Sequence, residues 1–296
     1  MHSNNRVLLT GCSGLVGGKL VEELCVLGFT VIGIRGTRPC RVKNDSHHCL
    51  SIDILSEDLS QYIRDARADF LIHTAWEMTP KSYWNDPINF SWTSASILLV
   101  QRFLDFGGEK VFVTGSCAEY SWLSETELSE ISKEDPTSAY GKSKLDLLRF
   151  FQIEKIPHLW TRTFFQFGKE RHSNKLIPTI IESTLAGVES SLSNPHHIRD
   201  YIHIDDVVTI LTKLVASNQS GVVNVGSGNG TTTSDVVQRI GDALGMEPKV
   251  KYTDQDGPST SVVADVKHLR ELLGEFEMQP FARSIECTIN EYLKPS

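Results

Sequence analysis

Residues 10–17 read Thr10-Gly11-Cys12-Ser13-Gly14-Leu15-Val16-Gly17, and this glycine-rich stretch is the strongest local indication of the fold. A short apolar run, 6–9, precedes it, and a helical pattern, 15–27, follows it. Glycines suit such a junction because the chain turns tightly, a pyrophosphate approaches the backbone, and the helix packs closely on the strand. The amide groups at the start of the helix then face the negative charge. The stretch therefore predicts a dinucleotide site.

The alternation of short apolar runs with helical patterns continues to about residue 165. Strands are predicted at 6–9, 30–34, 69–73, 110–114 and 158–163, and helices at 15–27, 88–106 and 138–154. Such alternation is typical of a parallel sheet covered by helices. We predict an α/β fold, a doubly wound parallel sheet of Rossmann type with a smaller C-terminal lobe. Residues 1–165 form the NAD(P)-binding domain, and residues 166–296 form a substrate lobe whose late segments can return to the sheet.

The composition excludes several classes of protein. The chain has 296 residues, a formal net charge of -8, 40% hydrophobic residues and 22% charged residues, as in an ordinary globular protein. An acidic chain makes nucleic acid a poor partner. No apolar run approaches the roughly 20 residues that cross a bilayer, and no signal-peptide pattern precedes the first strand. We therefore expect a cytoplasmic protein without a membrane partner.

The cysteines and histidines give no metal signature in the sequence. Six cysteines are scattered without a C-x-x-C pair, which argues against a zinc site and against a disulfide framework. The pairs His47-His48 and His196-His197 have no partner at metal-ligand spacing. No metal site is predicted.

Basic residues at the end of the second predicted strand bear on the choice of dinucleotide. A fold that prefers NAD usually places an acid there for the ribose 2′-hydroxyl. Here the strand ends with Arg35 and Arg38. They would attract a 2′-phosphate through charge-assisted hydrogen bonds, so we predict NADP(H), with NAD(H) as the alternative. Solvated loop charges are the other interpretation. Asp53 could meet the adenine amino group or be a turn residue.

A catalytic arrangement is predicted from two further segments. Tyr140 and Lys144 are four residues apart in a helical pattern and so share one face. An ammonium group one turn away would lower the pKa of the tyrosine. The strand at 110–114 leads into Ser116 at the carboxyl edge, where open α/β sheets bind ligands. Ser116 or Thr114 would hydrogen-bond the oxygen that Tyr140 protonates.

The glycine motif, the strand-end hydroxyl and the Tyr-x-x-x-Lys pair, in this order, resemble the extended branch of the short-chain dehydrogenase/reductase superfamily. Within that branch the chain is similar to the nucleotide-sugar epimerase, dehydratase and reductase group. Residues 162–168 resemble its R-x-F-N-x-Y-G segment, residues 199–206 its R-D-[FY]-I-x-V-x-D segment, and residues 224–228 its N-[IV]-G-[ST]-G turn. The resemblance covers nearly the whole chain.

The resemblance implies hydride transfer between a nicotinamide and a sugar carbon, with catalytic residues Ser116, Tyr140 and Lys144. Lys144 would hold the nicotinamide ribose, and Arg199 would lie near the substrate diphosphate. A homodimer formed through the helices 88–106 and 138–154 is also expected. The implied cofactor-binding residues are Gly11, Ser13, Gly14, Leu15, Val16, Gly17, Arg35, Arg38, Asp53, Ile54, His73, Thr74, Ala75, Asn89, Thr114, Tyr140, Lys144 and Phe164. The implied substrate-binding residues are Ser116, Cys117, Tyr140, Phe165, Gln166 and Arg199.

Departures from the group's pattern limit what can be carried over. Phe165 stands where relatives often have a substrate-contacting Asn, so that role passes to Gln166 or is lost. The dehydratases of the group place Asp-Glu after the catalytic hydroxyl, whereas this chain has Cys117 and Ala118. The sequence therefore disfavours a 4,6-dehydratase, and Glu119, one place further on, is expected to be structural.

Three functions remain open from the sequence. The leading one is NADPH-dependent reduction of a keto group, at C4, of a nucleoside-diphosphate 4-keto-6-deoxy sugar. The second is a nucleotide-sugar epimerase, which works by transient oxidation at C4 or by proton exchange beside a ketone, with Cys117 and His172 as the available acid-base pair. The third is a redox-sensing module without chemistry, which the Tyr-x-x-x-Lys pair disfavours. The aromatic residues Trp76, Tyr83, Trp84 and Trp92 are either a sugar-pocket wall or core.

Overall fold

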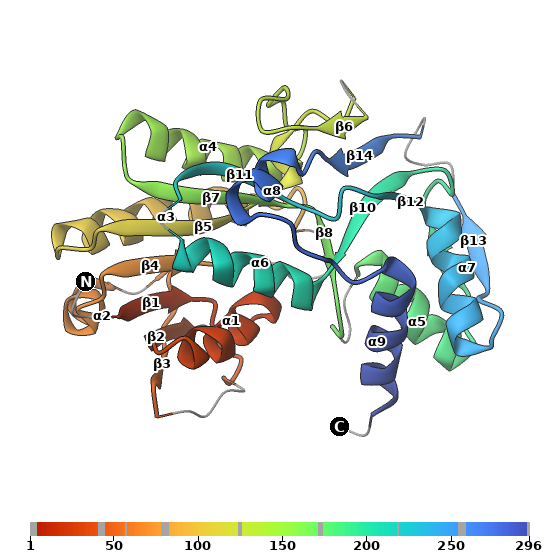
Figure 1. Cartoon of the computed structure of the whole chain (residues 1–296), viewed down its shortest axis with the longest axis horizontal. Coiled ribbons are helices and arrows are strands. Elements are labelled where there is room, and N and C mark those ends of the chain that lie inside the picture. The colour runs from red at the N-terminus through yellow and green to blue at the C-terminus, as the bar shows by residue number, and fades with distance from the viewer. Residues whose placement is uncertain are drawn as a thin grey trace. The chain divides into compact units, whose positions relative to one another are not determined.

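The chain forms two compact units in the computed structural model (Figure 1), which describes residues 5–40, 45–56, 58–77, 83–123, 126–170, 174–217, 219–253 and 259–294. Unit 1 comprises residues 1–119, 134–162 and 208–223, and unit 2 comprises residues 120–133, 163–207 and 224–296. The sequence places the boundary at about residue 165, and the main crossing between units follows Arg162. Two segments lie in the other unit from the one that this boundary predicts: 120–133 belongs to unit 2, and 208–223 belongs to unit 1.

Unit 1 is built on a seven-stranded sheet of order β11-β7-β5-β4-β1-β2-β3. The order reverses beside β1, so the sheet has the topological switch point at which doubly wound folds bind ligands. This confirms the predicted α/β fold. The strands are β1 (Arg6–Thr10), β2 (Thr30–Arg35), β3 (His47–Ser51), β4 (Phe70–His73), β5 (Lys110–Ser116), β7 (His158–Thr163) and β11 (Gly221–Val225).

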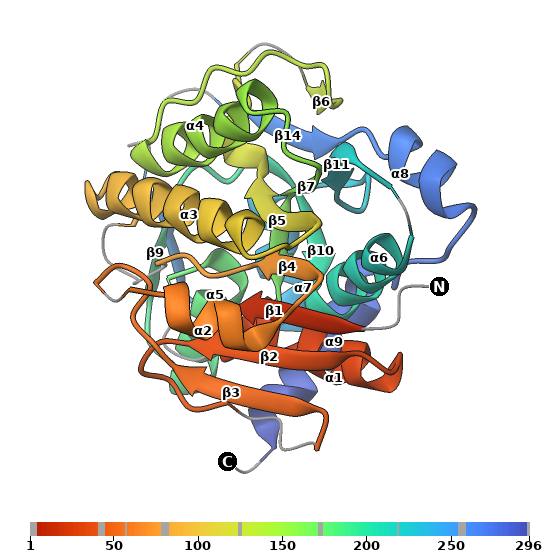
Figure 2. The same ribbon diagram turned by 90° about the vertical axis from the view of Figure 1, so that its left-hand side faces the viewer.

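Helices cover both faces of this sheet. Leu20 of α1 and Leu211 of α6 meet Ile72 and Phe112 on one face, and α2, α3 and α4 build a large apolar core on the other. Figure 2 shows α3 and α4 on one side of the strands and α1 and α6 on the other. Strands β1, β2, β4 and β5 are buried along most of their length, as expected for strands covered on both faces. The helices are α1 (Leu15–Val26), α2 (Ser60–Ala66), α3 (Ile88–Asp105), α4 (Ala139–Ile153) and α6 (Ile204–Ala216).

Local sequence signals account for the ends of these helices. Gly28 and Gly107 follow α1 and α3 with φ of 84° and 91°, a conformation that favours glycine and stops the helix. Ser138 begins α4 by accepting a hydrogen bond from the Gly141 amide at 3.0 Å. The helix that bears Tyr140 therefore starts at a defined residue, one position before the tyrosine.

Unit 2 combines a five-stranded sheet with a helical core. The sheet has the order β12-β10-β14-β6, with β8 paired to β10, and β9 and β13 form a separate pair. Phe167 and Tyr201 pack with apolar residues of α5, α7 and α9. The elements are β6 (Glu127–Leu128), β8 (Phe165–Phe167), α5 (Leu176–Ala186), β9 (Ser190–Leu192), β10 (Ile198–His203), β12 (Gly230–Thr232), α7 (Thr233–Leu244), β13 (Val250–Tyr252), β14 (Ser261–Ala264), α8 (Lys267–Leu273) and α9 (Phe281–Leu293).

Buried Asp200 joins the two late motifs of unit 2. Its carboxylate accepts hydrogen bonds from the amides of Ser227 at 2.8 Å, Gly228 at 2.9 Å and Ala264 at 3.1 Å. The 199–206 segment and the 224–228 turn are therefore one structural feature, in which Asp200 has a folding role. Among the described residues, no helix is long and apolar enough to cross a membrane.

Candidate active site

The glycine loop between β1 and α1 needs its first glycine for two reasons. Gly11 has φ of 77°, and a Cβ there would lie 2.8 Å from Thr74 Oγ1 and 2.9 Å from the Ala75 amide. The loop closes through hydrogen bonds from the Gly11 amide to Ile34 O and from the Gly14 amide to Gly11 O, both 2.8 Å. No side chain among the described residues caps the start of α1. The loop thus presents bare backbone at a helix N-terminus, as a pyrophosphate requires.

His73 fixes the strand end that packs against this loop. Its Nδ1 lies 2.7 Å from Thr10 Oγ1, and its Nε2 lies 2.8 Å from Ser96 Oγ. Ser96 donates its own proton to Trp92 O, so it accepts from Nε2, and Nδ1 accepts from Thr10. Burial lowers the pKa of His73 to about 3, with the Lys144 charge acting in the same direction. His73 is therefore a neutral positioning residue, and Thr74 is held next to it by donating to Thr10 O at 2.7 Å.

The neutral state of His73 makes stability depend on pH. Its pKa falls from the ordinary 6.5 to about 3 on folding, so below pH 6.5 the unfolded chain binds a proton that the folded chain does not. The free energy of unfolding should therefore fall as pH drops from 6.5 towards 3, by up to about 1.4 kcal/mol per pH unit from this group. We expect His73→Gln to lose that component of the slope in urea unfolding measured across this range. His48→Gln, at an exposed position, is the control. Equal dependence of the unfolding free energy on pH in the unaltered chain and in both variants would contradict the neutral state of folded His73.

The three residues predicted to be catalytic come together in unit 1. Tyr140 and Lys144 are buried on α4, and Ser116 is buried at the end of β5. The Ser116 side chain acts on the Tyr140 phenol and lowers its pKa. Lys144 Nζ donates to Thr114 O at 2.9 Å and lies 3.8 Å from the centroid of the Trp76 ring. The arrangement places a hydroxyl, a phenol and an ammonium group within one small region.

The electrostatics of this cluster differ from the prediction in one respect. The sequence predicts a lowered pKa for Tyr140, and this is wrong for the structure. Burial raises the pKa of Tyr140 well above its ordinary value, the Tyr83 phenol acts in the same direction, and only the hydrogen bond to Ser116 opposes them. Burial also lowers the pKa of Lys144 to about 7, against the opposing charge of Glu119. Tyr140 is therefore held as a neutral phenol, the form that donates a proton.

Aromatic side chains supply most of the apolar surroundings of Tyr140. The rings of Trp76, Tyr83 and Trp84 are half-buried, with centroids 6.2, 5.6 and 5.7 Å from that of Tyr140. Trp92 is a core residue that stacks on Trp76 at 5.9 Å. The sequence left open whether these four aromatic residues are core or line a sugar pocket. In the structure Trp92 is core, and Trp76, Tyr83 and Trp84 surround the Tyr140 ring.

Asn89 holds this aromatic group together. Its Oδ1 accepts from Trp76 Nε1 at 2.8 Å, and its Nδ2 donates to Tyr83 O at 2.5 Å and to Asp86 O at 2.8 Å. The sequence places Asn89 among the cofactor-binding residues. In the structure its side chain is fully buried and spans the aromatic segment, which makes it a positioning residue.

A buried carboxylate anchors the Ser116 segment. Glu119, at the end of the 3-10 turn Cys117–Glu119, accepts from the Ser116 amide at 2.8 Å, Trp160 Nε1 at 3.1 Å and Arg162 Nε at 2.7 Å. Arg162 also pairs with Glu134. Burial raises the pKa of Glu119, and Arg162 is the largest opposing influence. The structural role predicted for Glu119 is confirmed. No sequence pattern indicated its partner Trp160, or Glu134 as the second partner of Arg162.

The strand ends predicted to meet the adenosine half of the cofactor lie side by side. Arg35 is opposite Ser51 in the β2–β3 register, and the Ile52 amide donates to Arg35 O at 2.9 Å. Arg35 Nη1 donates to Gly36 O at 3.0 Å, so its guanidinium lies over its own turn, while Arg38 is exposed. Asp53 accepts from the Leu55 amide at 3.0 Å and from Ser56 Oγ at 2.6 Å. Asp53 is therefore a turn residue in the structure, beside buried Ile54.

Four further predicted site residues, Phe164, Phe165, Gln166 and Arg199, belong to unit 2. Phe164 is buried and donates its amide to Val225 O at 2.9 Å, and Phe165 and Gln166 follow on β8. The Arg199 guanidinium lies 5.2 Å from the ring centroid of Trp122 and 5.5 Å from that of Phe165. No sequence pattern had indicated Trp122 as a neighbour of Arg199.

Within the proposed acid-base pair of the epimerase mechanism, only one member can be located. Cys117 is buried in the turn after β5. His172 lies outside the residues that the structure describes.

Comparisons with known proteins show the family and the fold of the chain. The model of the NAD-dependent epimerase/dehydratase family matches residues 7–226. A UDP-glucose 4-epimerase of Lacticaseibacillus casei is 23% identical, with 90% of each chain covered. The solved UDP-glucose 4-epimerase of Thermus thermophilus, complexed with NAD, is 22% identical with a TM-score of 0.86, covering 97% of this chain and 98% of that one. The NAD-dependent NDP-hexosamine 5,6-dehydratase TunA is 21% identical with the same TM-score, and 97% of each chain is covered.

Proposed function

Because the chain belongs to the NAD-dependent epimerase/dehydratase family, we propose that it transfers hydride between a nicotinamide dinucleotide and a carbon of a nucleoside-diphosphate sugar. The observation that carries this proposal is the meeting of Ser116, Tyr140 and Lys144 at the carboxyl end of β5. The bare glycine loop, where a Cβ on Gly11 would collide with Thr74 and Ala75, fits the pyrophosphate of such a cofactor.

The chain's own residues have separate roles in this chemistry. When bound, the dinucleotide gives or takes the hydride. Tyr140 gives a proton to the carbonyl oxygen during reduction and takes it back during oxidation. Ser116 donates a hydrogen bond to that oxygen, where negative charge develops. Lys144 binds the nicotinamide ribose, and its positive charge favours the ionised phenol once the proton has left.

Within this chemistry we propose reduction of the C4 keto group of a nucleoside-diphosphate 4-keto-6-deoxy sugar, with NADPH. Three observations support it. Basic residues, Arg35 and Arg38, follow β2 where NAD-preferring folds place an acid. Tyr140 is a neutral phenol, ready to donate. Cys117 and Ala118 occupy the places of the dehydratase acid-base pair, which disfavours elimination.

A nucleotide-sugar 4-epimerase is the second candidate, and the curated relatives favour it. Several of them, from different organisms, are named UDP-glucose 4-epimerase. Such an enzyme would oxidise C4 and reduce it again from the opposite face with the same cofactor molecule. Ser116, Tyr140 and Lys144 would serve both directions, so the difference lies in whether the cofactor is consumed.

One experiment separates the two candidates. Purified protein is incubated with NADPH or NADH and a panel of nucleoside-diphosphate 4-keto-6-deoxy sugars, and the loss of reduced-nicotinamide absorbance is followed. In parallel, UDP-hexoses are incubated without added cofactor, and the sugars are resolved by chromatography. Reductase activity gives stoichiometric NADPH loss in the first assay. Interconversion in the second assay, with no NADPH loss in the first, would replace the reductase with the epimerase.

The arginines after β2 give a direct test of cofactor preference. Removing one charge-assisted hydrogen bond costs about 1.5–3 kcal/mol. We therefore expect Arg35→Ala and Arg38→Ala each to raise the Kd of NADPH by roughly 10- to 100-fold while leaving that of NADH almost unchanged. Arg67→Ala, at an exposed site outside this turn, is the matched control. Equal losses for both dinucleotides in titrations would mean that neither arginine reads a 2′-phosphate.

Two residues of unit 2 are proposed to contact the substrate. Arg199 would pair with its diphosphate, since a guanidinium binds phosphate oxygens in bidentate fashion. Gln166 would make the substrate contact that an Asn makes in relatives at the position of Phe165, because its Oε1 is buried without a hydrogen-bond donor among the described residues. The KM of the sugar nucleotide should rise in Arg199→Lys and Gln166→Leu.

A homodimer through α3 and α4 is also proposed. These helices pack together, and α3 exposes Phe90 and Leu98 to 50% and 57%. Apolar side chains of this size are typical of a surface that a second copy covers. Light scattering coupled to size-exclusion chromatography gives the mass in solution.

A further inference from the structure

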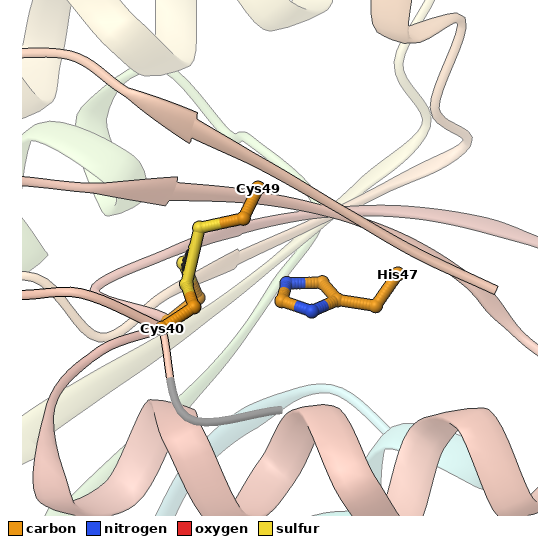
Figure 3. A group of neighbouring side chains, drawn as sticks. Cys40, His47 and Cys49 are labelled. Atoms are coloured by element: carbon orange, nitrogen blue, oxygen red, sulfur yellow. Dashed lines mark hydrogen bonds between the residues drawn. A yellow bond between two sulfur atoms is a disulfide. The ribbon is translucent and has the colours of Figure 1, made fainter. Parts of the chain in front are cut away.

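Three cysteines and one histidine from two separate parts of the sequence meet at the edge of the unit 1 sheet. Cys12 follows Gly11 in the glycine loop, Cys40 follows β2, and His47 and Cys49 lie on β3. Their potential ligand atoms all lie within 4.8 Å of one another. Figure 3 shows the sulfur atoms of Cys40 and Cys49 in contact and the His47 ring turned towards them.

The spacing of these groups resembles a tetrahedral metal site. His47 and Cys49 are two residues apart on an extended strand, so they project from the same face. Cys12 Sγ lies 3.2 Å from Cys40 Sγ and 3.7 Å from Cys49 Sγ. A zinc–sulfur bond of about 2.3 Å in a tetrahedron places two sulfurs about 3.8 Å apart. The cluster can therefore reach zinc geometry through small side-chain movements.

A glycine on the neighbouring strand makes room for this cluster. Gly33 lies opposite Cys49 in the β2–β3 register. A Cβ at Gly33 would lie 2.6 Å from Cys12 Sγ and 2.7 Å from His47 Nε2. The missing side chain thus creates the space in which the sulfur and the imidazole nitrogen approach each other.

The structure also contains a disulfide between Cys40 and Cys49, and the sequence prediction against disulfides is wrong for this pair. Their Cα atoms are 6.9 Å apart, just beyond the range of about 4.4–6.8 Å that disulfides usually span. A disulfide and a metal would use the same two sulfurs and exclude each other. The sulfurs are free to bind a metal only in the reduced protein.

We propose that the reduced protein binds one Zn²⁺ through the sulfurs of Cys12, Cys40 and Cys49 and an imidazole nitrogen of His47. Three thiolates and one imidazole form a closed four-ligand set, which is typical of structural zinc. Every ligand belongs to unit 1. The ion would tie the glycine loop to β2 and β3, and so would stabilise the strand edge that carries Arg35.

The test uses the full chain, kept reduced with a phosphine, stripped with a chelator and titrated with Zn²⁺ or Co²⁺. We expect one equivalent of metal per chain by elemental analysis, thiolate-to-cobalt charge-transfer absorption in the near ultraviolet, and a higher Tm with zinc. His47→Gln should weaken zinc binding at least about tenfold, as loss of a ligand does. His48→Gln, one position along β3 and exposed, should bind as the unaltered chain does.

Further variants guard against a general loss of folding. Cys49→Ser should lose the cobalt charge-transfer band while keeping its circular dichroism, and Cys25→Ser, in α1 outside the cluster, should keep both. The proposal is overturned if the chain with all six thiols reduced binds no zinc, or if His47→Gln and His48→Gln bind it equally. A Cys40–Cys49 disulfide that persists in the phosphine and excludes zinc would also overturn it.

Discussion

Tyr140→Phe is expected to lower kcat for hydride transfer by roughly 10²- to 10⁴-fold, the usual contribution of a positioned proton donor. The variant removes only the phenolic hydroxyl and keeps the ring that packs on Trp76, Tyr83 and Trp84. Folding and dinucleotide binding should therefore be unchanged. The measurement is the rate of NADPH loss with the best keto sugar, beside a cofactor titration of the same sample.

Two comparisons make this prediction specific. Tyr62→Phe, at an exposed site on α2, should keep full activity. Ser116→Ala should lower kcat without the full loss, because it removes one hydrogen bond to the developing charge and leaves the proton donor. Undiminished turnover in Tyr140→Phe would contradict the assignment and favour a binding module without chemistry.

Glu119→Ala is expected to lower the free energy of unfolding by about 3–5 kcal/mol, because it removes the buried carboxylate that pairs with Arg162 and leaves that buried charge paired with the partly exposed Glu134. Arg162 has no exposed side-chain surface and donates to Glu119 at 2.7 Å. The same substitution deprives the Ser116 amide and Trp160 Nε1 of their acceptor. Urea unfolding followed by fluorescence gives the change, and loss of the Ser116 anchor should also lower kcat.

Control variants separate the charge from the packing. Glu109→Ala, at an exposed position, should change stability by less than about 0.5 kcal/mol. The double variant Glu119→Leu/Arg162→Met should recover much of the stability lost in Glu119→Ala, because both charges of the fully buried pair are removed. A loss in Glu119→Ala as small as that in Glu109→Ala would show that the ion pair contributes little.

The sequence alone was sufficient for the fold and for selecting Ser116, Tyr140 and Lys144 as the proposed catalytic residues, because both depend on local patterns. The helix at 15–27 and the strand at 30–34 agree within one residue with α1 and β2, since apolar periodicity and glycine stops act over a few residues. Tyr140 and Lys144 share a face because helix geometry sets the four-residue spacing. The parallel alternation then places Ser116 at the same edge of the sheet.

The three-dimensional arrangement decided what depends on distant neighbours. Burial among aromatic rings from another segment raises the pKa of Tyr140, although the adjacent lysine alone predicts the opposite. Cys12, Cys40 and Cys49 follow no metal-binding spacing, yet the parallel register of β1, β2 and β3 brings their sulfurs together beside Gly33. Metal-binding sequence motifs describe ligands that lie on a single turn or hairpin. A parallel sheet instead brings together residues that are separated in the sequence by about one strand and one helix. Desolvation and such cross-strand meetings are properties of the folded chain, and no local pattern encodes them.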